Sequence, residues 1–424
     1  MTTTSCSFEW PSECLVDEIK VDVSALAGCS KNDVLVVVSP YRVCPLGAHI
    51  DHQGGVVTAM ALNKGVLLGF ISSGVNEILL KSRQFDGRVR FRFDDELTKE
   101  STATVEEAAW GNYARGAVYA LIKRGYRISK GIYGVIDGLK GLQGAGISSS
   151  AAVGVSILLA LEHANGLNLN PEENIHLDRS IENDFLGLKN GILDQSAILL
   201  SRRGCLTVIN CKEEKHKIVR PRSDIDTRGY KVLLAFSGLR HALSSNSSYN
   251  LRVSECQEAA LTLLRAVGRD TRQPLLSDVH MEEYQAFKTQ LKGACAKRAE
   301  HFFSECERVR KGIKAWEECD LKSFGRLMSE SGGSSIENYE CGCEPMIQLL
   351  EIVQGTPGVF GARFSGAGFR GCCVALIDAC FAEAAAKHIE LRYKQVQPLL
   401  AKQIENAFPV LICDTADHAY ICLS

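Results

Sequence analysis

Apolar residues follow two different spacings along this chain. Runs that are rich in β-branched residues and bounded by turn residues predict strands at 34–38, 66–71, 77–81 and 131–137. Apolar residues at helical spacing predict helices over 106–124, 148–164 and 171–187. The last of these begins at Pro171 and has acidic residues in its first turn, as helices commonly do.

The most polar long stretch in the middle of the chain is KEEKHKIVRPRSDIDTRG, residues 212–229. We expect it to separate two parts of the molecule. Beyond it, the pattern predicts a strand at 231–237, helices over 250–267 and 295–330, and a strand, a glycine turn and a second strand over 358–378. Strands and helices mix without a regular βαβ alternation, which favours an α+β fold over a doubly wound sheet.

Length and charge narrow the classes of function. A chain of 424 residues favours two domains over one core. A net charge of −2 without a basic block gives no reason to expect nucleic acid or an anionic membrane as a partner. No apolar run reaches the roughly 18–20 residues of a membrane span, and the first residues, MTTTSCSFEWPSE, do not resemble a secretion signal. We expect a cytoplasmic protein that is a monomer or a weak oligomer.

The cysteines fit that expectation. Seventeen are scattered without a C-x-x-C pair, which favours reduced thiols over a disulfide scaffold. Cys341 and Cys343 form a lone C-x-C, which is weak support for a zinc site.

The segment GLKGLQGAGISSSAA, residues 138–152, joins a glycine-rich loop to a helix that opens on serines. Glycine lets the backbone come close to a ligand, and the free N–H groups at a helix start favour an anion. Hydroxyls in the first turn can also reach a magnesium ion carried on phosphates. A glycine turn followed by serine caps on a core helix is the alternative. The chain has no Gly-Lys dipeptide, which excludes a P-loop NTPase.

Gly366, Gly368 and Gly371 form a G-x-G-x-x-G pattern, which in dinucleotide-binding proteins opens a helix. Here the strand-like CCVALI follows. We therefore expect a glycine turn between two strands, whose amides can face a ligand.

Candidate ionisable residues lie in three further segments. Asp194 is in the apolar NGILDQSAILLS (190–201), where a carboxylate is costly unless it is paired or functional; a satisfied structural aspartate is the alternative. Glu182 lies in IENDF on the helix before it, where a surface glutamate is the alternative. Arg42 lies in PYRVCPLGAHIDHQGG (40–55), together with two histidines and an aspartate.

Taken in their order along the chain, these motifs resemble those of the GHMP small-molecule kinase superfamily, and of its galactokinase branch in particular. The galactokinase motif GRVNLIGEHTDYNGG is matched by YRVCPLGAHIDHQGG (41–55), and GLSSSA by GISSSA (146–151). GIMDQ is matched by GILDQ (191–195), the glycine-rich third motif by SGAGFRGCC (365–373), and W-x-N-Y by WGNY (110–113). The similarity covers nearly the whole chain and is strongest to plant members that act on a sugar acid.

The resemblance implies a two-domain α+β fold, with kinase domains at 1–211 and 230–424 joined by 212–229, and with ATP and sugar meeting between them. It implies that Asp194 lies at the anomeric hydroxyl of the sugar with Arg42 beside it, and that Ser150 and Glu182 hold Mg²⁺. Whether Asp194 removes the proton or positions the hydroxyl stays open.

The same resemblance implies the residues that bind the two substrates. The sugar contacts are His49, Asp51, Gly191 and Tyr249. The ATP contacts are Trp110, Gly141, Gly144, Ala145, Gly146, Ser148, Ser149, Ser150 and Ala151. For Trp110, a place in the core is the competing explanation.

Ala48 departs from the galactokinase pattern, which has glutamate there, a residue that resembles an acceptor for the 6-hydroxyl of the sugar. A uronic acid carries a carboxylate at C6, and a glutamate would face it as a like charge. Alanine removes that repulsion. Lys189, in place of a proline, and Arg370, in place of a motif glycine, are candidate partners for the carboxylate; each has a solvated surface charge as the alternative.

We therefore expect Mg²⁺- and ATP-dependent phosphorylation of D-galacturonate at its anomeric hydroxyl. A kinase acting on neutral galactose is the nearest alternative, and glucuronate is acceptable in charge. A sugar sensor without activity on the same scaffold is an alternative from another class. Ser150, Ala151, Glu182 and Asp194 are all present, which argues against it.

Overall fold

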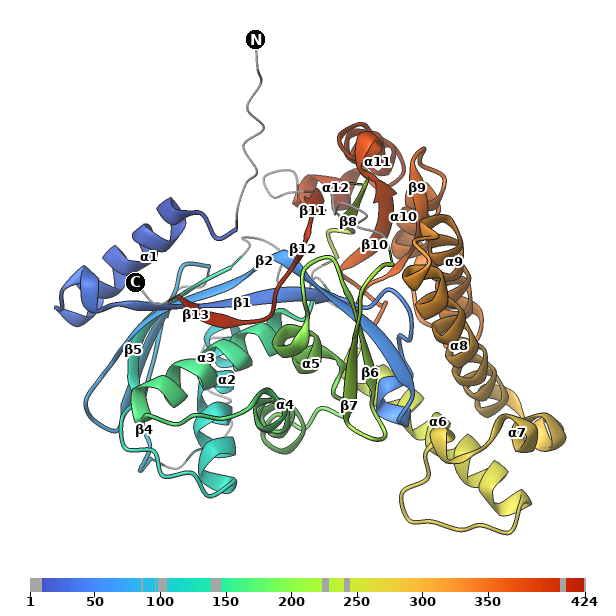
Figure 1. Cartoon of the computed structure of the whole chain (residues 1–424), viewed down its shortest axis with the longest axis horizontal. Helices are drawn as coiled ribbons and strands as arrows, with labels where there is room; N and C mark the ends of the chain where they lie inside the picture. Colours follow the sequence, from blue (N-terminus) through green and yellow to red (C-terminus); the bar gives the residue numbers. More distant parts are fainter. Residues whose placement is uncertain are drawn as a thin grey trace.

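The computed structural model describes residues 10–84, 87–95, 97, 105–138, 146–222, 229–239, 245–404 and 409–422. Its described elements form two β-sheets with helices packed on both (Figure 1). The α+β expectation is confirmed. No helix among the described residues is long and apolar enough to cross a membrane.

The first sheet contains nine of the described strands in the order β13-β1-β2-β5-β3-β4, with β6 and β12 also paired to β2 and β7 paired to β6. The strands are β1 (Leu35–Val43), β2 (Val56–Ser72), β3 (Glu77–Ser82), β4 (Arg88–Arg92), β5 (Ile132–Asp137), β6 (Leu206–Asn210), β7 (Lys215–Val219), β12 (Thr415–Ala416) and β13 (Tyr420–Cys422). Because β13 pairs with β1 and β12 with β2, the last described strands lie beside the first two strands (Figure 1).

Alternation along β1 explains how this sheet is covered on both faces. Val36 and Val38 pack under α1 (Glu13–Ala27), whereas Val37, between them, faces the main core. The main-core face carries α3 (Ser149–Asn165), which packs against β1 and β2. The neighbouring helices are α2 (Val105–Lys123), α4 (Pro171–Ser180) and α5 (Leu193–Leu200).

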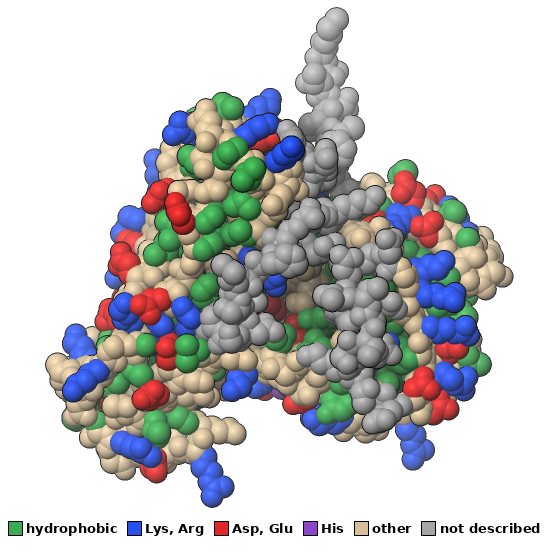
Figure 2. All heavy atoms as spheres, turned by 180° about the vertical axis from the view of Figure 1, so that it is seen from behind, with side chains coloured by type: hydrophobic (Ala, Val, Ile, Leu, Met, Phe, Trp, Pro, Cys, Tyr) green, Lys and Arg blue, Asp and Glu red, His purple; other side chains and the backbone are tan. Residues whose placement is uncertain are grey.

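The second sheet is antiparallel, in the order β11-β8-β10-β9. Its strands are β8 (Tyr230–Phe236), β9 (Val359–Phe364), β10 (Cys372–Asp378) and β11 (Val410–Cys413). Its strands contact the helices α9 (Leu321–Glu337), α10 (Glu344–Gln354) and α11 (Ala382–Val396). The remaining helices pack on one another: α12 (Pro398–Gln403) on α11, α8 (Gly293–Glu317) on α9, α6 (Ser245–Ala266) on α8, and α7 (Met281–Phe287) on α6. The described surface seen from behind is hollowed between two lobes and mixes both signs of charge (Figure 2).

Most of the expected elements are confirmed, and two helices need correction. The helix expected over 295–330 is two helices, because Cys319 adopts a φ of 63° and the Asp320 side chain then accepts a hydrogen bond from Ser323 N at the start of α9. The helix expected over 171–187 stops being α-helical at Ser180, and Ile181–Phe185 forms a π-helical turn.

The segment 212–229 contains β7, so part of it belongs to the first sheet. The domain limits 1–211 and 230–424 therefore remain proposals. The Gly366–Gly371 loop joins the antiparallel strands β9 and β10, as expected for a turn between strands.

Candidate active site

Arg42, Ser148 and Asp194, from three different elements, meet at one point. Arg42 lies near the end of β1, Ser148 precedes the first residue of α3, and Asp194 is in the first turn of α5. Arg42 donates to Asp194 Oδ1 from Nε at 2.8 Å and from Nη2 at 2.7 Å. Ser148 Oγ donates to Asp194 Oδ2 at 2.5 Å. Both carboxylate oxygens are therefore fixed, as expected of a group that must face a reacting atom.

These residues line a cavity of about 280 Å³. Of the residues proposed from the sequence, eleven line it: Arg42, Ala48, His49, Asp51, Gly146, Ser148, Ser149, Ser150, Asp194, Tyr249 and Arg370. The fold thus gathers residues from both sheets and from segments more than 300 positions apart.

The start of α3 faces this cavity with its first-turn N–H groups uncapped by a side chain. Ser148 occupies the cap position with a left-handed φ of 55°, and its hydroxyl bonds Asp194 instead of the helix. An anion can take that place. Gly146 has a φ of 76°, and a Cβ there would lie 2.4 Å from Ser365 O, so only glycine fits the approach to the β9–β10 loop. Gly141, Gly144 and Ala145 lie outside the described residues.

Glu182 lies beneath the cavity and not on its lining. Its carboxylate accepts from Asn190 Nδ2 and is hydrogen-bonded to Ser150. Burial, followed by the charge of Asp194, raises the pKa of Glu182 to about 7. A buried carboxyl joined to a first-turn serine is a donor pair that suits a divalent cation. Glu182 belongs to the π-helical turn, a local change of helix period that sequence periodicity did not reveal.

His49 and Asp51 shape the opposite side of the cavity. His49 is buried with a φ of 67° and stacks on Tyr339 with 4.2 Å between ring centroids. Gly191 lies against Asp51 and not on the lining, since a Cβ there would be 2.5 Å from Asp51 Oδ2. Burial, followed by the charge of Asp194, raises the pKa of Asp51 from 3.8 to about 6.

Asp51→Asn is expected to stabilise the ligand-free protein while weakening sugar binding. A carboxyl with a raised folded pKa makes its full contribution to stability below pH 3.8 and loses it as the pH rises through about 6. The variant should gain on the order of 1–2 kcal/mol at pH 8 and less at pH 5. Chemical unfolding at both pH values and the KM for the sugar measure the two effects. A variant that is destabilised equally at both would show that the lost hydrogen bonds dominate.

Besides Glu182 and Gly191, three further proposed residues lie away from the cavity lining. Lys189 is exposed, although its neighbours Leu188 and Asn190 both line the cavity. Trp110 is buried in the main core, in agreement with the competing explanation, and Ala151 is fully buried there as well. Lys189 therefore receives no support from its position as a partner for the substrate carboxylate.

Gly366, expected in a turn that can face a ligand, lies on the lining, whereas sequence reasoning missed eight lining residues: Cys44, Leu188, Asn190, Leu193, Asn250, Phe364, Ala367 and Phe369. Most of them are immediate neighbours of residues that it named. The SGAGFRGCC motif held the clearest signal, because its glycine turn was expected to face a ligand. The described lining residues include two arginines, Arg42 and Arg370.

Comparisons with known proteins place both halves of the chain in the same family. The model of the GHMP kinases N terminal domain matches residues 112–202, and that of the GHMP kinases C terminal matches 313–395. A galacturonokinase from Arabidopsis thaliana is 53% identical over 98% of this chain and 100% of its own length. A galactokinase from Clostridium perfringens is 30% identical over 86% and 91% of the two chains. The crystal structure of Lactococcus lactis galactokinase complexed with galactose superposes with a TM-score of 0.81 at 27% identity, covering 95% of this chain and 98% of that one.

Proposed function

This chain belongs to the GHMP kinases, and from that premise we propose that it transfers the γ-phosphoryl group of ATP to the anomeric hydroxyl of D-galacturonate. The observation that carries the substrate assignment is Ala48, an uncharged small side chain on the lining of the cavity that holds the Arg42–Asp194 pair. The relatives support this substrate assignment, because a galacturonokinase is 53% identical over its full length whereas the galactokinases are only about 30% identical.

The geometry of Asp194 suggests how the reaction proceeds. The anomeric hydroxyl lies against the carboxylate, which takes its proton as the oxygen attacks the γ-phosphorus and the bond to the β-phosphate oxygen breaks. Arg42 and Ser148 hold the two carboxylate oxygens in place, so the base does not have to reorganise. Phosphoryl transfer makes small covalent demands, and this positioning supplies much of what the reaction needs.

We propose that the triphosphate of ATP binds at the start of α3. Its uncapped N–H groups and the close approach at Gly146 fit a phosphate group. Ser150 and Glu182 would hold the Mg²⁺, which neutralises phosphate charge when it is bound. Asn190 keeps the Glu182 carboxylate oriented.

ATP consumption by the purified protein with Mg²⁺ tests this proposal, with D-galacturonate, D-galactose and D-glucuronate as competing substrates. We expect a strong preference for galacturonate in kcat/KM. Preference for galactose would keep the kinase and overturn the account of position 48. Binding of a sugar without consumption of ATP would indicate a sensor instead.

Arg370→Ala is expected to raise the KM for galacturonate about tenfold to a hundredfold, because a charge-assisted hydrogen bond contributes roughly 1.5–3 kcal/mol. The KM for galactose should change much less. Arg370 lines the cavity, whereas Lys189 is exposed and off the lining, so Lys189→Ala is the matched control. Equal effects of Arg370→Ala on both sugars would remove this arginine from the specificity of the site.

A further inference from the structure

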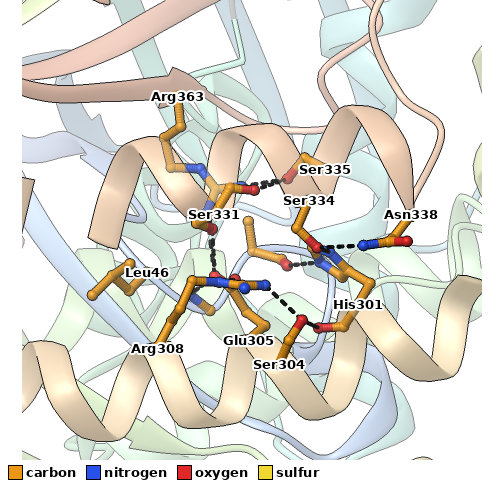
Figure 3. Close-up of polar contacts among 12 residues, drawn as sticks. Leu46, His301, Ser304, Glu305, Arg308, Ser331, Ser334, Ser335, Asn338 and Arg363 are labelled. Carbon is orange, nitrogen blue, oxygen red and sulfur yellow. Dashed lines mark hydrogen bonds and ion pairs between the residues drawn. The ribbon is translucent and has the colours of Figure 1, made fainter. Parts of the chain in front are cut away.

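A group of buried side chains, which we call the loop clamp, contacts the main chain at Gly47 and Ala48. It comes from α8, α9 and β9 and consists of His301, Glu305, Ser331, Ser334 and Arg363 (Figure 3). Each of these side chains is at most 7% exposed. No motif covers the clamp, and none of its residues lines the cavity.

Two hydrogen bonds join the clamp to the loop. Gly47 N–H donates to Glu305 Oε1 at 2.7 Å, and His301 Nε2 lies 3.0 Å from Ala48 O. Gly47 and Ala48 are consecutive in the loop. Their partners, Glu305 and His301, lie four residues apart and therefore on the same face of α8. The two bonds therefore fix the Leu46–Gly47 and Ala48–His49 peptide groups, which lie on either side of the Gly47–Ala48 unit.

Glu305 is itself fixed by three donors. Ser331 Oγ donates to its Oε1 at 2.5 Å, Arg363 Nη1 lies 3.4 Å from the same oxygen, and Arg308 Nε donates to Oε2 at 2.6 Å. Burial alone would raise the pKa of Glu305, but the two arginines hold it at about 2. The glutamate is therefore a charged and oriented acceptor for the Gly47 amide.

The partners of the two ring nitrogens show which nitrogen of His301 carries the proton. Burial lowers the pKa of His301 to about 4, so the ring is neutral at physiological pH. A carbonyl can only accept, which places the proton on Nε2. Nδ1 then accepts from Ser334 Oγ at 2.9 Å, and Ser334 Oγ accepts from Asn338 Nδ2 at 3.2 Å. Both ring nitrogens of His301 and the Ser334 hydroxyl therefore have hydrogen-bond partners.

The position of the clamp matters because Ala48 is the proposed specificity residue. We propose that His301, supported by the other clamp residues, is a positioning residue that sets the sugar preference of the site by fixing the peptide group of Ala48. The inference rests on the proposed function. Without the clamp, the carbonyl of Ala48 would lose its partner and the loop could shift toward or away from C6 of the sugar.

Two substitutions at position 301 separate this role from simple packing. Glutamine can place its amide N–H near the Nε2 position and reach Ala48 O. Asparagine can replace the contact of Nδ1 with Ser334 but is too short to reach the loop. Ser335→Ala is the control within the same buried network, because Ser335 contacts Arg363 and Ser331 but no loop atom.

His301→Asn should raise the KM for galacturonate about tenfold, with kcat changed less than about threefold, which corresponds to one lost buried hydrogen bond. The preference for galacturonate over galactose should fall by a similar factor. His301→Gln should keep most of that preference, and Ser335→Ala should keep all of it even if it lowers the melting temperature. Binding of galacturonate without ATP, measured by calorimetry, provides a second readout.

Equal losses for both sugars in His301→Asn, or equal behaviour of the asparagine and glutamine variants, would overturn the role of His301. A wild-type protein that prefers galactose would instead contradict the proposed function. In that case an altered sugar ratio in His301→Asn would still support the clamp, so the two failures are distinguishable.

Discussion

Asp194→Asn is expected to lower kcat for sugar phosphorylation by about 10²–10⁴-fold, the range of a lost general base. The amide has nearly the same shape as the carboxylate and can still accept from Arg42. It cannot take the proton of the anomeric hydroxyl, and it leaves the buried guanidinium of Arg42 without its counter-charge. Steady-state ADP release measures kcat, and calorimetry with galacturonate tests whether the sugar still binds.

Ser148→Ala is the matched control for this variant. It removes the hydrogen bond to Asp194 Oδ2 and leaves the carboxylate and the Arg42 pair in place. A loss of about tenfold is expected from one hydrogen bond to a charged group. If Asp194→Asn keeps more than about a tenth of wild-type kcat, proton removal contributes little and Asp194 mainly orients the hydroxyl.

The sequence predicted the parts of this site that lie within one segment. The start of α3 and the turn between β9 and β10 each follow from local glycine and serine chemistry, and the structure has both as expected. The meeting of Arg42 with Asp194, 152 positions apart, was implied by the resemblance to other kinases. Composition and periodicity alone could not have brought these two residues together.

Two features could not be predicted for physical reasons. Glu305 and Arg363 each occupy an element whose pattern is that of an ordinary helix or strand, so nothing local reveals that they form a buried pair. The second feature is the direction of the Lys189 side chain. Lys189 lies between two residues that line the cavity, and its side chain is exposed, so adjacency in sequence did not give adjacency in space.

Ala48→Glu is expected to lower kcat/KM for galacturonate by about 10²–10³-fold and to leave galactose at least as good a substrate as before. Two carboxylates about 4 Å apart repel by about 4 kcal/mol at an effective dielectric near 20. Ala48 is 7% exposed and lines the cavity, so the added atoms must enter the space of the substrate. The hydrogen bonds from Gly47 and to Ala48 O prevent the backbone from retreating.

Ala48→Gln separates charge from size, because glutamine adds the same bulk without the charge. If repulsion sets the preference, glutamine should cost galacturonate far less than glutamate does, and raising the salt concentration should change little at so enclosed a position. Equal losses from both variants would mean that position 48 selects by volume. No loss from either would place C6 of the sugar elsewhere in the cavity, and Arg370 would then need a different partner from the one proposed.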